Sequence, residues 1–179
     1  LFHAYEPHLH LQAEERRVLE IALRSALEKN EFHLEYQPVV DAGTGQLTGF
    51  ETLLRWTHPE LGAISPAKFV PAAEDARLIA PIGEWVLRTA CPEAAHWGNG
   101  VRVAVNVSAE QLHNPGFVGV VAHALAQSGL IPSRLELEVT ERTVMHDADI
   151  HIGTLTALHR MGVELSIDDF GTGYSSLAY

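Results

Sequence analysis

The chain has 179 residues, of which 46% are hydrophobic and 20% charged, a balance that is ordinary for one globular domain with a sizeable core. Its formal net charge of −11 argues against a surface for DNA or for anionic membranes. No apolar run is long enough for insertion in a bilayer, and the single cysteine, Cys91, cannot form an internal disulfide. We therefore expect a cytoplasmic domain, with any membrane anchor of a longer parent protein lying upstream of it.

The first third of the chain predicts one helix and two antiparallel strands. Residues 1–12 show no periodicity and indicate a linker, whereas apolar residues recur on one helical face over 13–29. Apolar and polar residues alternate over 32–40 and again over 47–56, as they do in half-buried strands. The turn of six residues between them is too short for a parallel crossover, so these two strands are predicted to be antiparallel.

From residue 65 onward, helical and strand patterns alternate. Ser65-Pro66 is typical of a helix start, because proline is tolerated at the first helical position. Ser108 and Gln111 have the spacing of a capping box, and Pro92 is expected to kink or split the helix that contains it. The predicted elements are helices over 65–75, 82–97, 117–128 and 148–161, and strands over 101–107, 135–140 and 163–168. Their order predicts an α/β fold with parallel strands.

Three polar residues lie near the ends of these later strands. Asn106, Glu138 and Asp168 follow one another at intervals of 32 and 30 residues, the size of one strand–helix unit. Each lies opposite the large aliphatic residues of its own strand, so the three side chains are predicted to share a face of the sheet. Enzymes with a TIM-type (β/α) barrel collect their chemistry at this end of the strands. An open doubly wound sheet has the same local pattern, so the repeat alone does not separate the two architectures.

A set of side-chain oxygens is predicted to gather at these strand ends. Carboxylate and amide oxygens suit Mg²⁺ or Mn²⁺, and the set lacks the His and Cys expected for zinc. Such ions would let an acidic domain hold a phosphodiester and would activate a water molecule. The candidate metal ligands are Glu51, Asn106, Glu138, Asp168 and Asp169. Arg55 is predicted on the Glu51 face, where it could hold a phosphate oxygen or pair with Glu51.

Six short motifs, in this order, resemble the EAL domain, the bacterial phosphodiesterase that opens cyclic di-GMP to linear pGpG. Each motif alone is weak, and the six in order are specific. The motifs are Tyr36-Gln37-Pro38, GFETLLRW at 49–56, His58-Pro59, Asn106-Val107-Ser108, EVTE at 138–141 and DDFGTGYSS at 168–176. The resemblance covers residues 17–179, as the N-terminal part of an EAL domain, and leaves 1–16 as a connector of the kind that follows a GGDEF domain.

The resemblance implies a TIM-type barrel with an antiparallel first strand. It makes the five candidate ligands the metal site, with Glu51, Asp168 and Asp169 as catalytic residues. It also implies that Gln37 and Arg55 contact the dinucleotide, that Leu54 and Pro59 line its pocket, and that Glu141 steadies the loop over 170–176. In the family this loop couples metal binding to a dimer interface, so a homodimer is implied. The implied partners are cyclic di-GMP and an upstream GGDEF or sensory domain.

Two departures from the family pattern bear on function. Thr52 replaces the alanine of the signature, and because it points away from Glu51 we expect little harm. The family also continues with further strand–helix units that carry a lysine, a glutamate and a glutamine of the site, and these fall beyond Tyr179. The resemblance therefore implies an incomplete barrel in this chain, with impaired activity when the chain is isolated from its parent.

Three functional interpretations follow. The first is a metal-dependent cyclic di-GMP phosphodiesterase in the parent protein. The second is a receptor that binds cyclic di-GMP without cleaving it, which the retained ligand positions disfavour for the parent. The third sets the family resemblance aside and takes the chain as another metal-assisted barrel enzyme, such as an enolising lyase. Activity on cyclic di-GMP, binding without turnover, or activity on a carboxylate substrate would separate them.

Overall fold

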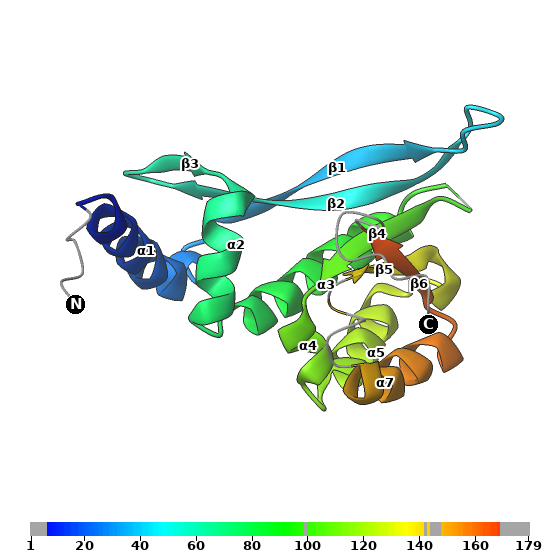
Figure 1. Ribbon diagram of the computed structural model, residues 1–179. Helices are drawn as coiled ribbons and strands as arrows, with labels where there is room; N and C mark the ends of the chain where they lie inside the picture. Colours follow the sequence, from blue (N-terminus) through cyan, green and yellow to red (C-terminus); the bar gives the residue numbers. More distant parts are fainter. Residues whose placement is uncertain (1–6, 99, 142, 144–147, 169–179) are drawn as a thin grey trace. The chain divides into compact units, whose positions relative to one another are not determined.

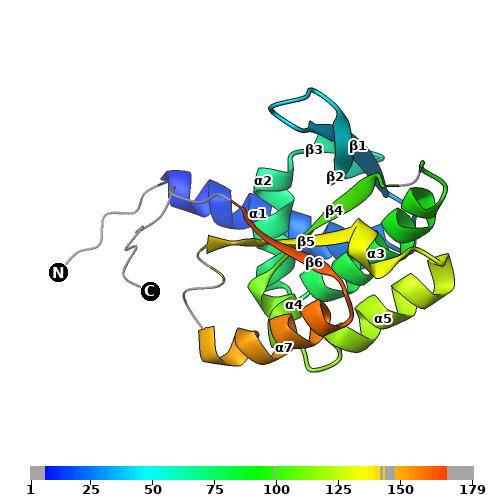
Figure 2. The same cartoon turned by 90° about the vertical axis from the view of Figure 1, so that its right-hand side faces the viewer.

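The computed structural model describes residues 7–98, 100–141, 143 and 148–168 (Figures 1 and 2). Helices and strands alternate along the later part of the chain, as predicted. The helices are α1 (Pro7–Ala26), α2 (Pro66–Asp75), α3 (Ile79–Ala95), α4 (Ala109–His113), α5 (Phe117–Ser128), the 3₁₀ helix η1 (Pro132–Arg134) and α7 (Ala148–Arg160). The strands are β1 (Phe32–Val40), β2 (Leu47–His58), β3 (Gly62–Ile64), β4 (Arg102–Val107), β5 (Leu135–Thr140) and β6 (Glu164–Asp168).

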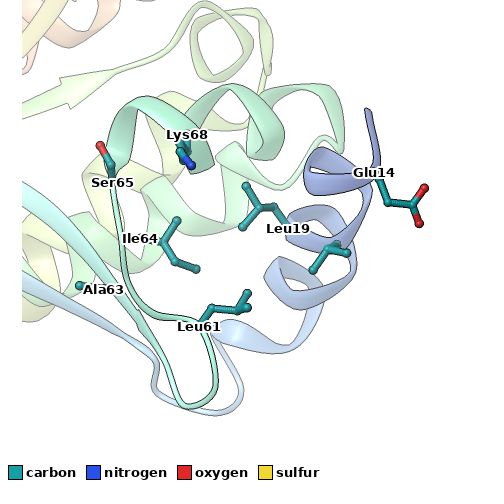
Figure 3. A pocket seen from close by; sticks show the side chains of 8 residues that line it. Glu14, Leu19, Leu61, Ala63, Ile64, Ser65 and Lys68 are labelled. Atoms are coloured by element: carbon teal, nitrogen blue, oxygen red, sulfur yellow. The ribbon is translucent and has the colours of Figure 1, made fainter. Parts of the chain in front are cut away.

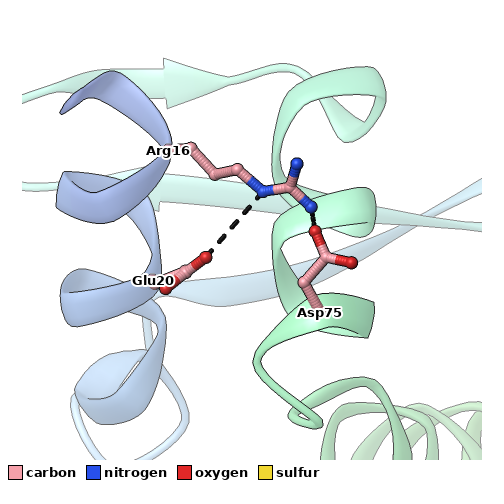
Figure 4. Close-up of polar contacts among 3 residues, drawn as sticks. All are labelled: Arg16, Glu20 and Asp75. Atoms are coloured by element: carbon pink, nitrogen blue, oxygen red, sulfur yellow. Dashed lines mark ion pairs between the residues drawn. The ribbon is translucent and has the colours of Figure 1, made fainter. Parts of the chain in front are cut away.

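The chain divides into two compact units. The first unit comprises Leu1–His33 and Arg55–Ile79, and the second comprises Leu34–Leu54 and Ala80–Tyr179. In the first unit, α1 packs against α2, and Arg16 on α1 forms ion pairs with Glu20 and Asp75 (Figure 4). These pairs are exposed, so they add little to stability.

An aromatic cluster forms the core of the first unit. Trp56, which is 1% exposed, packs against Phe32 and Phe69 at ring-centroid distances of 5.8 and 5.6 Å. Its indole Nε1 donates a hydrogen bond of 2.9 Å to Oε2 of Glu31, so the buried indole N–H is satisfied. Trp56 is therefore a core residue of the first unit.

The sheet has the strand order β1-β2-β4-β5-β6, with β3 paired to β2. The β2/β4, β4/β5 and β5/β6 pairs are parallel. The hairpin between β1 and β2 is closed by the amide of Asp41, which donates to the carbonyl of Gln46 at 2.9 Å, and this confirms the antiparallel first strand (Figure 1). Within the described residues the sheet is open, with β1 and β6 at its edges, as expected for an incomplete TIM-type barrel.

In the second unit, helices α5 and α7 lie on one side of β4, β5 and β6 in both views (Figures 1 and 2). The side chains that the strands direct toward this layer are fully buried, including Val103, Leu135 and Leu137. Arg134 on η1 ties the end of α3 to the segment before β4, because its guanidinium donates to the carbonyls of Ala94 at 2.6 Å and Val101 at 2.8 Å. The carbonyl of Ala94 also accepts from the amide of Trp97 at 3.1 Å.

The predicted elements are mostly confirmed, and the short helices α4 and η1 add to them. Helix α1 begins at Pro7, before its predicted start at residue 13, and Pro7 occupies the first helical position, where proline is tolerated. Pro92 lies inside one continuous helix, α3, so the prediction that it might split this helix is also wrong. The three-residue strand β3 was not predicted, because so short a segment carries no period.

Candidate functional site

The strand register brings the predicted metal ligands to one face of the sheet. Glu51 on β2 is paired with Ala104 on β4, and Asn106 on β4 is paired with Glu138 on β5. Paired residues in a sheet point to the same side, and residues two apart on a strand do as well. Asp168 at the end of β6 is paired with Thr140, two residues beyond Glu138. Glu51, Asn106, Glu138 and Asp168 therefore share a face, opposite the valines and leucines that meet the helices.

A direct contact joins two of these side chains. The amide Nδ2 of Asn106 donates to Oε1 of Glu51 across 3.0 Å, although the two residues are 55 positions apart in the chain. Glu51 is half-buried and Asn106 is exposed, so the contact lies at the border between sheet and solvent. The contact brings together two members of the predicted set of oxygen ligands.

The pKa of Glu138 responds to the other carboxylates of this face. Its pKa is raised from 4.5 to about 7, first by burial and then by the negative charges of Glu51, Asp168 and Glu136. Each of these causes disfavours the ionised carboxylate. A cation held among the same carboxylates would reverse the effect, because it favours the charged form.

The donor set fits a hard divalent cation in its chemistry. Three carboxylates and one amide face each other, and oxygen ligands of this kind hold Mg²⁺ and Mn²⁺. No group of three or more His, Cys, Asp and Glu side chains within the described ranges is arranged to hold a metal ion by those residue types alone. Glu51, Glu138 and Asp168 are of those types and do not by themselves form such a group here, and Asp169 lies outside the described residues, so the ligand set of five stays a prediction.

The four predicted substrate-binding residues fall in both units. Gln37 on β1 is exposed and Leu54 on β2 is half-buried, and both belong to the second unit. Arg55 is half-buried and Pro59 is exposed, and both belong to the first unit. Their roles toward a ligand stay predictions.

Glu141, predicted to steady the following loop, directly follows β5. It is 7% exposed, a low value for a carboxylate, which indicates a side chain held by the fold and not a solvated one. The loop itself, over 170–176, lies outside the described residues together with Asp169. The predicted contact between Glu141 and that loop is therefore not tested.

The structure also shows features that the motifs did not predict. A cavity of about 520 Å³ in the first unit is lined mainly by apolar side chains of α1 and of the β3 region, with Lys68 at its edge (Figure 3). None of the predicted site residues lines it. In the second unit, His113 on α4 and His151 on α7 lie in contact. No local sequence pattern predicts this pair, because the two histidines are 38 positions apart in the chain.

These observations define a class of domain: an incomplete (β/α) barrel that gathers carboxylates at the carboxyl ends of its parallel strands. Residues 20–179 match the family described as EAL domain. The chain therefore belongs to the EAL domain family.

Two relatives from Pseudomonas aeruginosa carry descriptions of activity. The chain is 48% identical to MucR, a bifunctional diguanylate cyclase/cyclic di-GMP phosphodiesterase, over 179 residues that cover 98% of the chain and 26% of MucR. It is 43% identical to the cyclic di-GMP phosphodiesterase NbdA over 175 residues, which cover 94% of the chain and 22% of NbdA. The chain thus spans about a quarter of the length of these curated relatives.

A solved structure agrees with these relatives. The PaMucR phosphodiesterase in complex with c-di-GMP has 50% identity and a TM-score of 0.84, covering 88% of this chain and 66% of that one. This similarity confirms the TIM-type fold class that the motifs implied. No helix within the described residues is long and apolar enough to cross a membrane.

Proposed function

We propose that the protein carrying this chain is a metal-dependent phosphodiesterase that hydrolyses cyclic di-GMP to linear pGpG. The observation that carries the proposal is the convergence of Glu51, Asn106 and Glu138 from three different strands, seen in the 3.0 Å contact between Asn106 and Glu51 and in the raised pKa of Glu138. Carboxylates gathered in this way repel one another and lower stability, and a bound cation would offset that repulsion. The descriptions of MucR and NbdA, and of the PaMucR complex, support this activity and this substrate.

Each residue has a proposed role in the reaction. Glu51, Asn106, Glu138, Asp168 and Asp169 would hold Mg²⁺ or Mn²⁺, which when bound supplies a Lewis acid for phosphodiester hydrolysis. Arg55 would bind a phosphate oxygen through its guanidinium, and Gln37 would hydrogen-bond the dinucleotide. Leu54 and Pro59 would supply apolar contact to it. Water cleaves one of the two phosphodiester bonds, which leaves a 5′-phosphate and a 3′-hydroxyl on the linear product.

The setting of the reaction is proposed on the same basis. MucR combines a diguanylate cyclase with a phosphodiesterase, so we infer an upstream GGDEF or sensory domain in the parent of this chain. A homodimer and a cytoplasmic location stay predictions of the family resemblance and of the low cysteine content.

The test uses the full-length protein with Mn²⁺ or Mg²⁺ and cyclic di-GMP. We expect conversion to pGpG, measured by chromatography and mass spectrometry, and its loss on addition of a chelator. Glu51→Gln keeps the size of the side chain and removes its charge, so it should lower turnover by about 100-fold or more if Glu51 holds the ion. Turnover no greater than that of Glu51→Gln in the unmodified protein would reject the proposal, and calorimetric binding of cyclic di-GMP without turnover would identify a receptor instead.

A further inference from the structure

A helical turn begins directly after β5, with Glu141 and Thr143 in helical conformation and Thr140 before them. Thr140, the last residue of β5, lies two residues after Glu138 and is paired in register with Asp168. The hydroxyls of Thr140 and Thr143 lie 2.9 Å apart, and the amide of Thr143 donates to Oγ1 of Thr140 at 3.3 Å. This turn is therefore closed on itself at the edge where Glu138 and Asp168 converge.

His151 fastens this turn to helix α7. The side chain is 1% exposed, and its Nδ1 lies 2.9 Å from the carbonyl oxygen of Thr143. A carbonyl oxygen only accepts, so Nδ1 carries the proton and donates it. This bond from a buried imidazole on α7 holds the backbone of the turn at Thr143.

His113 on α4 completes the arrangement. Its Nδ1 lies 3.3 Å from Nε2 of His151 and 2.8 Å from the carbonyl of Ala109. The Ala109 carbonyl requires a proton on Nδ1 of His113, and with Nδ1 of His151 protonated its Nε2 is an acceptor, so the single His113 proton is shared between the Ala109 carbonyl and Nε2 of His151. The hydroxyl of Thr154 on α7 also donates to the carbonyl of Leu112 at 3.2 Å, which holds α7 against α4 beside the pair.

We propose that His151 is a positioning residue for the metal site, because its bond to the Thr143 carbonyl fixes the turn that ends β5 and thereby the placement of Glu138 relative to Asp168. This inference rests on the proposed function for its activity readout. Among the described ligands Glu51, Asn106, Glu138 and Asp168, none is hydrogen-bonded to His151, which acts through the two threonines. Partners that orient metal ligands from one layer away change metal affinity or activity by about 10- to 100-fold when they are removed.

Three substitutions of His151 separate its two bonds. The amide nitrogen of asparagine is as many bonds from Cα as Nδ1 is, so His151→Asn can keep the donor to Thr143. The amide of glutamine reaches the position of Nε2, so His151→Gln can keep the contact with His113 and loses the donor to Thr143. His151→Leu keeps an apolar volume and removes both bonds.

The experiment measures Mn²⁺ affinity and cyclic di-GMP turnover of the full-length protein and of the three variants, each at a temperature where a thermal melt shows it folded. We expect His151→Asn to stay within about 3-fold of the unmodified protein, and His151→Gln and His151→Leu to lose about 10-fold or more in Mn²⁺ affinity and kcat, with KM for cyclic di-GMP little changed. Equal losses in Asn and Leu variants, or no loss in any, would overturn the proposal. If the unmodified protein binds Mn²⁺ without turnover, the proposed function fails, and the Mn²⁺ affinities alone decide the role of His151.

Discussion

Replacing Thr52 by valine tests how the one departure from the family signature is accommodated. Thr52 lies on β2 next to Glu51, paired in register with Val105, and it is 5% exposed. Its hydroxyl is buried and has no hydrogen-bond partner among the described residues. Valine has the same branched shape and lacks the hydroxyl, so Thr52→Val removes the unpaired group without opening a cavity.

The expected gain follows from the cost of that hydroxyl. Burying a hydroxyl without a hydrogen bond costs about 1–3 kcal/mol in protein mutational data. We therefore expect Thr52→Val to raise the free energy of unfolding by about 1 kcal/mol or more, which corresponds to a rise in Tm of about 2–4 °C for a chain of this size. Because Thr52 faces away from Glu51, Mn²⁺ affinity should not change.

Thermal unfolding followed by circular dichroism measures the effect, and Thr48→Val is the matched control. The hydroxyl of Thr48, on the same strand, donates to the carbonyl of Val39 at 3.1 Å. The control loses a hydrogen bond and should therefore lower stability, by about 0.5–1 kcal/mol. A Tm for Thr52→Val at or below that of the unmodified chain would refute the reasoning, because the hydroxyl would then be satisfied in the folded state.

Three further predictions concern the second unit. Arg134→Met should lower the free energy of unfolding by about 1.5–3 kcal/mol in urea titrations, because the carbonyls of Val101 and Ala94 lose a charged donor. A loss below about 0.5 kcal/mol, as for a typical surface substitution, would contradict this prediction. A Cβ on Gly83 would lie 2.1 Å from Nε2 of Gln111, whose side chain belongs to the capping box of α4. Gly83→Ala should therefore lower the free energy of unfolding. The double variant Gly83→Ala/Gln111→Ala should lose less free energy of unfolding than the sum of the two single variants. Because its pKa is raised, Glu138 binds a proton more tightly in the folded chain than in the unfolded chain. Without divalent cations, the free energy of unfolding should therefore fall as the pH rises from 4.5 to about 7. Glu138→Gln should flatten that part of the pH profile.

Much of the fold follows from local periods in the sequence. The strict alternation in β1 and β5 and the repeat of about 30 residues between strand ends are properties of the backbone geometry, and they predict the strands and the shared face of Asn106 and Glu138. The capping box of Ser108 and Gln111 is confirmed bond by bond, because capping depends on residues only three apart.

Features that depend on packing between distant segments were not predictable in this way. The contact between His113 and His151 exists because α4 and α7 pack together, and neither histidine has a neighbour in sequence that indicates it. The hydroxyl of Thr52 has no partner among the described residues because the residue paired with it on β4 is Val105, and the sequence of β2 alone does not show this. Helix α1 extends to Pro7, beyond the apolar pattern from which its start at residue 13 was predicted, and proline is compatible with this first helical position.

Thr52 and Glu51, which are neighbours on β2, allow a loss of stability to be separated from a role in function. Thr52 and Glu51 place polar atoms on opposite faces of one strand, and each lowers stability in its own way: a buried hydroxyl without a partner, and a carboxylate that raises the pKa of Glu138. Replacing a polar group that serves the site should raise stability and remove function. Replacing one without a role should raise stability and leave function unchanged. Thr52→Val is therefore expected to stabilise the chain and leave Mn²⁺ binding intact, while Glu51→Gln, which also relieves charge repulsion, is expected to abolish it. If both substitutions left Mn²⁺ binding unchanged, the carboxylates at these strand ends would not be a metal site.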